Sequence, residues 1–208
     1  MNWNEVLLDS AKSGDLACVR EAVQNGVNID ATNRWGRSAL LDSAEKGFVA
    51  VVEFLLANGA NIEHKDIFGM NALMEASQFG HFEVVKILLK NGAKLDVKNN
   101  DGKCALQLAL EQRDVEIVRY FVECGADVNT RTEDGFSVLM MAVAHLDMDF
   151  AERILGSGAV SKDAISDALD FLYDVAKFKD YLVWSDMCDL LYGIMSIAGG
   201  RFCAESSV

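Results

Sequence analysis

Residues 67–98 read IFGMNALMEASQFGHFEVVKILLKNGAKLDVK, and most of the chain repeats this stretch at a step of 33 residues. Three columns of identical residues share the step. They are a leucine column (Leu7, Leu40, Leu73, Leu106, Leu139, Leu172), a glycine column (Gly26, Gly59, Gly92, Gly125, Gly158) and a second glycine column (Gly36, Gly69, Gly102, Gly135). Three columns in one register predict a repeat protein in which each unit stacks on the next.

The spacing within the stretch predicts two helices. The second helix places apolar residues on one face at helical spacing: Val84, Val85, Leu88 and Leu89. Leu73 belongs to the first helix. Gly69 supplies the tight reversal before the first helix, and Gly92 follows the second helix, where a left-handed cap is favoured. A single unit cannot bury its apolar face, so we expect a core that runs between neighbouring units.

The stretch resembles an ankyrin repeat. The family pattern G-x-T-P-L-H-x-A-A-x-x-G-H-x-x-V-V-x-x-L-L-x-x-G-A matches at Gly69, residues 71–74, Ala76, Gly80, His81, Val84, Val85, Leu88, Leu89, Gly92 and Ala93. The resemblance implies an all-α fold, an ankyrin-repeat solenoid of stacked helix-turn-helix units with short hairpin loops. We expect five repeats over residues 1–160 (units 1–33, 34–66, 67–99, 100–132 and 133–160), a degenerate C-terminal capping helix pair over 161–198 and a flexible tail over 199–208.

The segment after Gly158 departs from the repeat but keeps helical spacing over residues 162–177 and 181–198. The first of these segments carries an acidic face: Asp163, Asp167, Asp170 and Asp174. Two amphipathic helices suit a terminal cap, because the last repeat must present a polar surface to water. A separate partner-binding helical pair is the alternative.

The chain also departs from the family inside its repeats. The T-P-L-H run never occurs intact, and its histidine position holds Leu8, Leu41, Met74, Gln107 and Met140. In the family, the Thr and His make buried polar bonds between neighbouring loops. We therefore expect apolar contacts in their place and loops that are held less rigidly. The pairs Arg113-Asp114 and Leu146-Asp147 replace the usual Gly-His, which predicts locally altered turns.

Charge and cysteine content limit the possible partners and compartment. The formal net charge of −13 argues against nucleic acid and anionic membranes, and it favours a basic protein partner or simply solubility. Five cysteines without a Cys-x-x-Cys pair indicate reduced thiols. No segment resembles a signal peptide or a membrane span. We expect a monomer in the cytoplasm of the producing cell, or of a host cell if the protein is a delivered effector.

No motif supports catalysis. The three histidines, His64, His81 and His145, lack metal-binding spacing, and His81 stands at a structural position of the ankyrin pattern. No phosphate-binding loop, nucleophile elbow or dinucleotide fingerprint occurs. We expect no catalytic residue, no cofactor and no metal.

By the resemblance, partners bind at the hairpin tips and at the exposed face of the first helices. Large apolar groups and acidic residues fall at these positions. With Trp3, which we expect at the end of the stack, and the hairpin residue Arg37, the candidate partner-binding residues are Trp3, Asp9, Trp35, Arg37, Asp42, Glu45, Phe68, Met70, Glu75 and Phe79. Aromatic anchors beside carboxylates suit a partner that carries Lys or Arg on an apolar patch. Alternatively, Trp35 and Phe68 pack against each other and stiffen the hairpins.

The sequence thus predicts a noncatalytic protein–protein interaction module that binds a basic partner protein through its concave face. One alternative is a bacterial immunity or inhibitor protein that neutralises a basic toxin or enzyme. Another is a secreted ankyrin effector.

Overall fold

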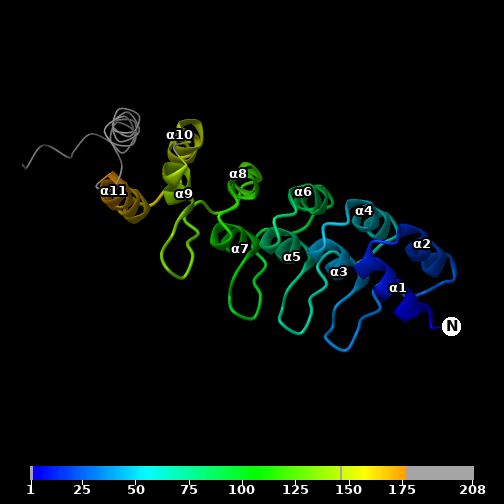
Figure 1. Cartoon of the computed structure of the whole chain (residues 1–208). Helices are drawn as coiled ribbons and strands as arrows, with labels where there is room; N and C mark the ends of the chain where they lie inside the picture. Colours follow the sequence, from blue (N-terminus) through cyan, green and yellow to red (C-terminus); the bar gives the residue numbers. More distant parts are fainter. Residues whose placement is uncertain (1, 146, 177–208) are drawn as a thin grey trace, which may run out of the picture. The chain divides into compact units, whose positions relative to one another are not determined.

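The computed structural model describes residues 2–145 and 147–176, and all the regular elements in this part of the chain are helices (Figure 1). They form five pairs and one further helix: α1 (Trp3–Ser13) with α2 (Leu16–Gln24), α3 (Ala39–Glu45) with α4 (Val49–Ala57), α5 (Ala72–Gln78) with α6 (Phe82–Lys90), α7 (Ala105–Glu111) with α8 (Val115–Glu123), α9 (Val138–Ala144) with α10 (Met148–Gly156), and α11 (Lys162–Ala176). The helices from α4 to α10 begin 33 residues after their counterparts in the preceding pair. The all-α repeat fold is confirmed.

The chain divides into two compact units, Met1–Ile117 and Val118–Val208. In the first unit, α1, α3, α5 and α7 pack side by side in sequence order, and α2, α4 and α6 form a second layer against them (Figure 1). Long hairpin loops lead into α3, α5 and α7 (Figure 1). In the second unit, α9 packs against both α10 and α11. No helix in the described ranges is long and apolar enough to cross a membrane.

The predicted core columns are buried. Five residues of the leucine column are at most 2% exposed: Leu7, Leu40, Leu73, Leu106 and Leu139. The paired apolar residues of the second helices are buried as well, as in Val84 and Val85. The repeated spacing therefore identifies the apolar face of each helix correctly.

In the first three helix pairs, the turn between the two helices lies against a side chain of the next pair. Gly47 has a φ of 73°, in the left-handed region, and a Cβ at this residue would lie 2.5 Å from Nδ1 of His81. The His81 ring is held there because its Nε2 lies 2.7 Å from the carbonyl oxygen of Glu45. Gly14 has the same relation to the ring of Phe48. Glycine is thus required both for its conformation and for the close approach of the next unit.

The predicted alteration of the turn at Arg113 is wrong. Arg113 has a φ of 60°, so it adopts the left-handed conformation that Gly80 adopts at the equivalent position, with a φ of 72°. Asp114 replaces the histidine and accepts a hydrogen bond from the backbone N–H of Ile117 at 3.0 Å, which caps α8. The turn keeps its shape at the cost of backbone strain. The other predicted alteration, at Leu146, lies outside the described residues.

The Thr position of the T-P-L-H run keeps a polar role, contrary to the prediction. Ser38, Asn71 and Ser137 cap the helices that follow, and Asn71 Oδ1 accepts a hydrogen bond from the Met74 N–H at 3.0 Å. Such caps stabilise a helix by about 1 kcal/mol. At the His position the prediction of apolar contacts is confirmed for Leu41 and Met74, which are buried.

The helix α11 has the amphipathic character expected of the segment after Gly158. Ala164 and Ala168 are fully buried, Asp163 and Asp170 are exposed, and Asp167 pairs with Arg131. That the segment acts as a cap stays a prediction, because the expected second helix and the tail lie outside the described residues.

Replacing Arg113 with glycine should raise the free energy of unfolding by about 0.5–1 kcal/mol. The left-handed conformation costs a residue with a Cβ about 1–2 kcal/mol, and glycine removes this cost. Glycine also loses more backbone entropy on folding, but this loss cancels only part of the stabilisation. Urea unfolding followed by circular dichroism measures the change.

The matched control is Gly80→Ala, at the equivalent position of the preceding pair. It should lower the free energy of unfolding by about 1 kcal/mol or more, and its Cβ would lie 3.3 Å from Oδ2 of Asp114. A destabilised Arg113→Gly variant would contradict the account of strain at this turn.

Candidate protein-binding surface

Each hairpin loop of the first unit is held by one polar side chain that accepts two backbone hydrogen bonds. In the second hairpin, Asp66 Oδ1 accepts from the N–H of Phe68 at 2.8 Å and from the N–H of Met70 at 3.0 Å. Asn33 and Asn99 make the same pair of bonds in the hairpins on either side. These bonds fix the backbone that presents Phe68 and Met70.

Neighbouring hairpins are joined at their tips by backbone hydrogen bonds. The N–H of Ile67 donates to the carbonyl oxygen of Trp35 at 3.1 Å, and the N–H of Asn100 donates to that of Phe68 at 3.0 Å. The Asn100 side-chain amide also donates to the carbonyl oxygen of Ile67 at 2.9 Å, so the tips form one connected edge.

Four large apolar side chains are exposed within the described residues: Trp35 (47%), Ile67 (50%), Phe68 (60%) and Phe79 (51%). The guanidinium of Arg34 lies 5.0 Å from the centroid of the Trp35 ring. In the described part of the chain, the structure records no ring contact between Trp35 and Phe68. The alternative that these two rings pack together is therefore wrong, and both are presented to solvent.

Arg37, at the end of the first hairpin, joins four carboxylates through one guanidinium group. Its Nε lies 2.6 Å from Asp42 Oδ1, and its Nη2 lies 2.5 Å from Glu45 Oε2. Its Nη1 lies 2.5 Å from Glu75 Oε1 and 3.5 Å from Asp66 Oδ2. Because Asp66 lies at the second hairpin and Glu75 lies on α5 of the next repeat, Arg37 connects two repeats. We call Arg37, Asp42, Glu45, Asp66 and Glu75 the Arg37 cluster.

The expected exposed ladder of acidic residues is therefore corrected. Asp42 is only 6% exposed and Glu75 only 4%, because Arg37 covers both carboxylates. Glu45 is half-buried and also binds Lys46 at 2.7 Å. Asp9 is exposed. The position two residues after the column leucine is thus a buried position in the repeats that follow the first.

Burial and mutual attraction act in opposite directions on the charges of the cluster. Burial alone would lower the pKa of Arg37, but hydrogen bonds and charges from Asp42 and Glu75 outweigh it and raise the pKa further above its ordinary value. Burial raises the pKa of Glu75, and the charge and hydrogen bonds of Arg37 offset only part of that rise. Arg37 thus stays charged, while Glu75 has to share this one cation with three other carboxylates.

All members of the Arg37 cluster except Asp42 line a pocket of about 430 Å³. The pocket, which we call the Arg37 pocket, is lined by Arg37, Glu45, Asp66, Phe68, Met70, Glu75, Gln78, Phe79, Asn99, Asp101, Lys103, Leu108 and Glu111. Lys103 pairs with Glu111 at 2.8 Å. Two basic and five acidic side chains give the lining a formal net charge of −3. Exposed rings and excess negative charge therefore meet in one cavity.

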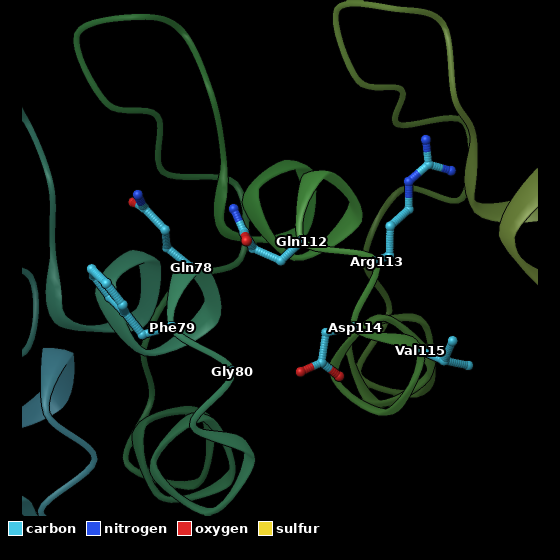
Figure 2. Close-up of a pocket in the computed structure, with 7 residues that line it drawn as sticks. All are labelled: Gln78, Phe79, Gly80, Gln112, Arg113, Asp114 and Val115. Carbon is cyan, nitrogen blue, oxygen red and sulfur yellow. The ribbon is translucent and has the colours of Figure 1, made fainter.

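A second pocket, of about 610 Å³, lies beside the ends of α5 and α7 (Figure 2). Its lining, which defines the Gln112 pocket, comprises Gln78, Phe79, Gly80, Gln112, Arg113, Asp114 and Val115. Gln78 and Gln112 project side by side, while the carboxylate of Asp114 lies beside Gly80 (Figure 2). Gln78 and Phe79 line both pockets, so they form the wall that the two cavities share.

The structure gathers six of the ten candidate residues around the Arg37 pocket: Arg37, Glu45, Phe68, Met70, Glu75 and Phe79. Asp42 contacts Arg37 but does not line the cavity, and Trp35 lies at the hairpin tip. Trp3 is half-buried at the first residue of α1, and neither Trp3 nor Asp9 lines the pocket. That the ten residues bind a partner stays a prediction.

The candidate set omitted Asp66, Asn99 and Lys103, which line the Arg37 pocket. Asp66 and Asn99 belong to a 33-residue column of polar residues with Asn33 and Thr132, so the sequence carried a signal for them. Lys103 and its partner Glu111 stand at the positions that Arg37 and Glu45 occupy two repeats earlier, so the candidates Arg37 and Glu45 pointed to them.

The described residues contain no group of three or more His, Cys, Asp or Glu side chains arranged to hold a metal ion. The carboxylates of the Arg37 cluster instead have Arg37 as their cation. The arrangement can present rings and negative charge to another molecule.

The structure is that of a helical repeat protein. Its hairpins and first helices present a surface of the kind that binds other molecules. The chain matches the sequence profile of ankyrin repeats, in three copies, over residues 7–99 and 91–164. It belongs to the ankyrin-repeat family, whose repeats generally mediate protein–protein interaction and are typically noncatalytic. The comparison with curated proteins found no match.

Replacing Arg37 with alanine should lower the free energy of unfolding by about 3 kcal/mol, because it leaves buried carboxylates without their cation. Urea unfolding of the full chain measures the loss. The matched control is Arg34→Ala on the same hairpin, which removes an exposed guanidinium and should change stability by no more than about 0.5 kcal/mol. Equal stability of the two variants would contradict a structural role for the cluster.

The contribution of Glu75 to stability should fall as the pH rises. Its pKa is raised above the ordinary value of 4.5, so above that pH the folded state retains a proton that the unfolded chain has lost. The free energy of unfolding of the wild type, minus that of Glu75→Gln, should therefore decrease from about pH 4 to about pH 7. Urea unfolding at several pH values tests this, and a difference that grows with pH would refute it.

Proposed function

We propose that this protein is a noncatalytic binding module whose partner protein places a basic and apolar segment in the Arg37 pocket. One observation carries the proposal. Phe68 and Phe79, which are 60% and 51% exposed, line the same cavity as an excess of carboxylates. Large exposed apolar groups mark interaction surfaces more often than any other role.

The two kinds of side chain would contribute differently to binding. Aromatic rings that become buried at the centre of an interface supply most of the binding free energy. The carboxylates around them would attract Lys or Arg and set the orientation of the partner. Asp101, which is exposed at the third hairpin tip and lines the pocket, stands where an incoming cation would first meet it.

The overall charge of −13 supports a basic partner by long-range attraction. A scaffold, an inhibitor of a basic toxin or enzyme, and a delivered effector would all use such a surface. We propose that the protein acts as a monomer in the cytoplasm, on the grounds of its odd number of cysteines and the lack of a Cys-x-x-Cys pair. The activity of the partner within the complex would distinguish inhibition from scaffolding.

The experiment is affinity capture with the full chain from a lysate of the producing organism, followed by mass spectrometry and affinity measurement on the captured protein. Phe68→Ala should weaken binding by about 2 kcal/mol, or roughly 30-fold, because it removes an exposed anchor. Asp101→Lys should also weaken binding, and its effect should be larger at low salt, because the repulsion between the new lysine and the basic partner is then less screened.

The control is Glu53→Lys, which makes the same charge change at an exposed position on α4. Circular dichroism should show that all three variants remain folded, since the altered side chains are exposed. A captured partner with the same affinity for the wild type and for Phe68→Ala would contradict the proposal that this surface binds the partner.

A further inference from the structure

The two pockets described above lie side by side on consecutive repeats, and together we call them the trough. Gln78 and Phe79 line both the Arg37 pocket and the Gln112 pocket. Phe79 is 51% exposed. A segment that fills one pocket can therefore continue over Phe79 into the other.

Two unused amide groups stand along this trough. Gln78 is the last residue of α5, and Gln112 is the C-cap of α7, which packs directly against α5. Their side chains project to the same side (Figure 2), and within the described residues neither amide makes a hydrogen bond to the protein. By contrast, Asn58 and Asn91 at the ends of α4 and α6 donate to backbone carbonyl oxygens.

A primary amide matches the hydrogen-bonding groups of a peptide backbone. It offers one acceptor oxygen and two N–H donors, so it can pair with both the N–H and the C=O of another chain. Stacked helices lie about 10 Å apart, and an extended chain covers that distance with about three residues. One extended strand that crosses both helices could therefore bond to an amide on each of them.

We propose that the trough binds an extended peptide segment, whose main chain bonds to Gln78 and Gln112 and whose basic side chain enters the Arg37 pocket. The proposal rests on the proposed function and specifies the form of the partner. A helix satisfies its own main-chain groups, so only an extended segment offers free N–H and C=O groups to both amides.

The charges of the two pockets determine which of them receives the basic side chain of the bound segment. The lining of the Arg37 pocket carries a formal net charge of −3, whereas Arg113 and Asp114 balance each other in the Gln112 pocket. A Lys or Arg side chain therefore prefers the Arg37 pocket, with its aliphatic part against Phe68 and Phe79. The main chain then runs from there toward Gln112.

The test begins with a phage-displayed library of random linear peptides selected on the immobilised full chain. The best peptide is synthesised, and its Kd is measured by fluorescence anisotropy for the wild type and for Gln78→Ala, Gln112→Ala and Phe68→Ala. Each glutamine variant should raise the Kd by about 3- to 10-fold, the value of one hydrogen bond. The matched control is Gln24→Ala at the exposed end of α2, which should leave the Kd unchanged.

A second measurement distinguishes main-chain bonds from a general loss of surface. N-methylation of the peptide at successive positions removes one N–H donor at a time. We expect two sensitive positions about three residues apart, each of which loses its effect in the corresponding glutamine variant. Replacing the basic residue of the peptide with norleucine should weaken binding most at low salt.

The outcomes separate this inference from the proposed function. Peptides that depend on Phe68 but not on either glutamine would overturn the extended-segment proposal and leave the binding surface intact. Failure to select any linear peptide, alongside a captured protein that Phe68→Ala releases, would overturn it in the same way. Peptides that bind Phe68→Ala as tightly as the wild type would overturn both proposals.

Discussion

The surface of the first unit depends on one guanidinium group that is shared among four carboxylates. Arg37 binds Asp42 and Glu45 on the helix that follows its hairpin, and it also reaches Asp66 at the second hairpin and Glu75 in the next repeat. The same contacts hold two repeats together and leave negative charge in excess beneath Phe68. Stability and recognition therefore draw on the same side chains, and the cluster cannot be treated as a row of independent acidic groups.

The periodicity of the sequence was sufficient to predict the helices and their buried faces. Each column marks a backbone conformation or a core position that recurs in every repeat and needs the same type of residue. Leu73 is buried for the same reason as Leu40 and Leu106. The Arg37 cluster has no such column: the positions equivalent to Arg37 hold Met70, Lys103 and Phe136. An interaction that occurs at one place only, and that depends on how a long side chain folds over its neighbours, leaves no periodic signal. Asp66, which belongs to a polar column, did leave one.

The departures from the ankyrin pattern change which side chains make the contacts between neighbouring repeats, but contacts between the repeats are still made. Leu41 and Met74 bury apolar side chains where the family has histidine, while Ser38 and Asn71 retain the helix caps. Hydrogen bonds between hairpin tips and the contacts of Arg37 then supply polar links between neighbouring units. The fold tolerates these exchanges because no buried side-chain nitrogen or oxygen atom in the described part of the chain is left without a hydrogen-bond partner.

The contact of His81 with Gly47 makes the order of the repeats part of the information in the sequence. A repeat that carries this histidine needs a predecessor without a Cβ at the turn, because the ring occupies that space. Gly14, Gly47 and Gly80 all leave this space open, whereas Arg113 carries a Cβ at the equivalent position. A repeat with this histidine could therefore follow any of the first three repeats, but behind the fourth its ring would meet the Cβ of Arg113.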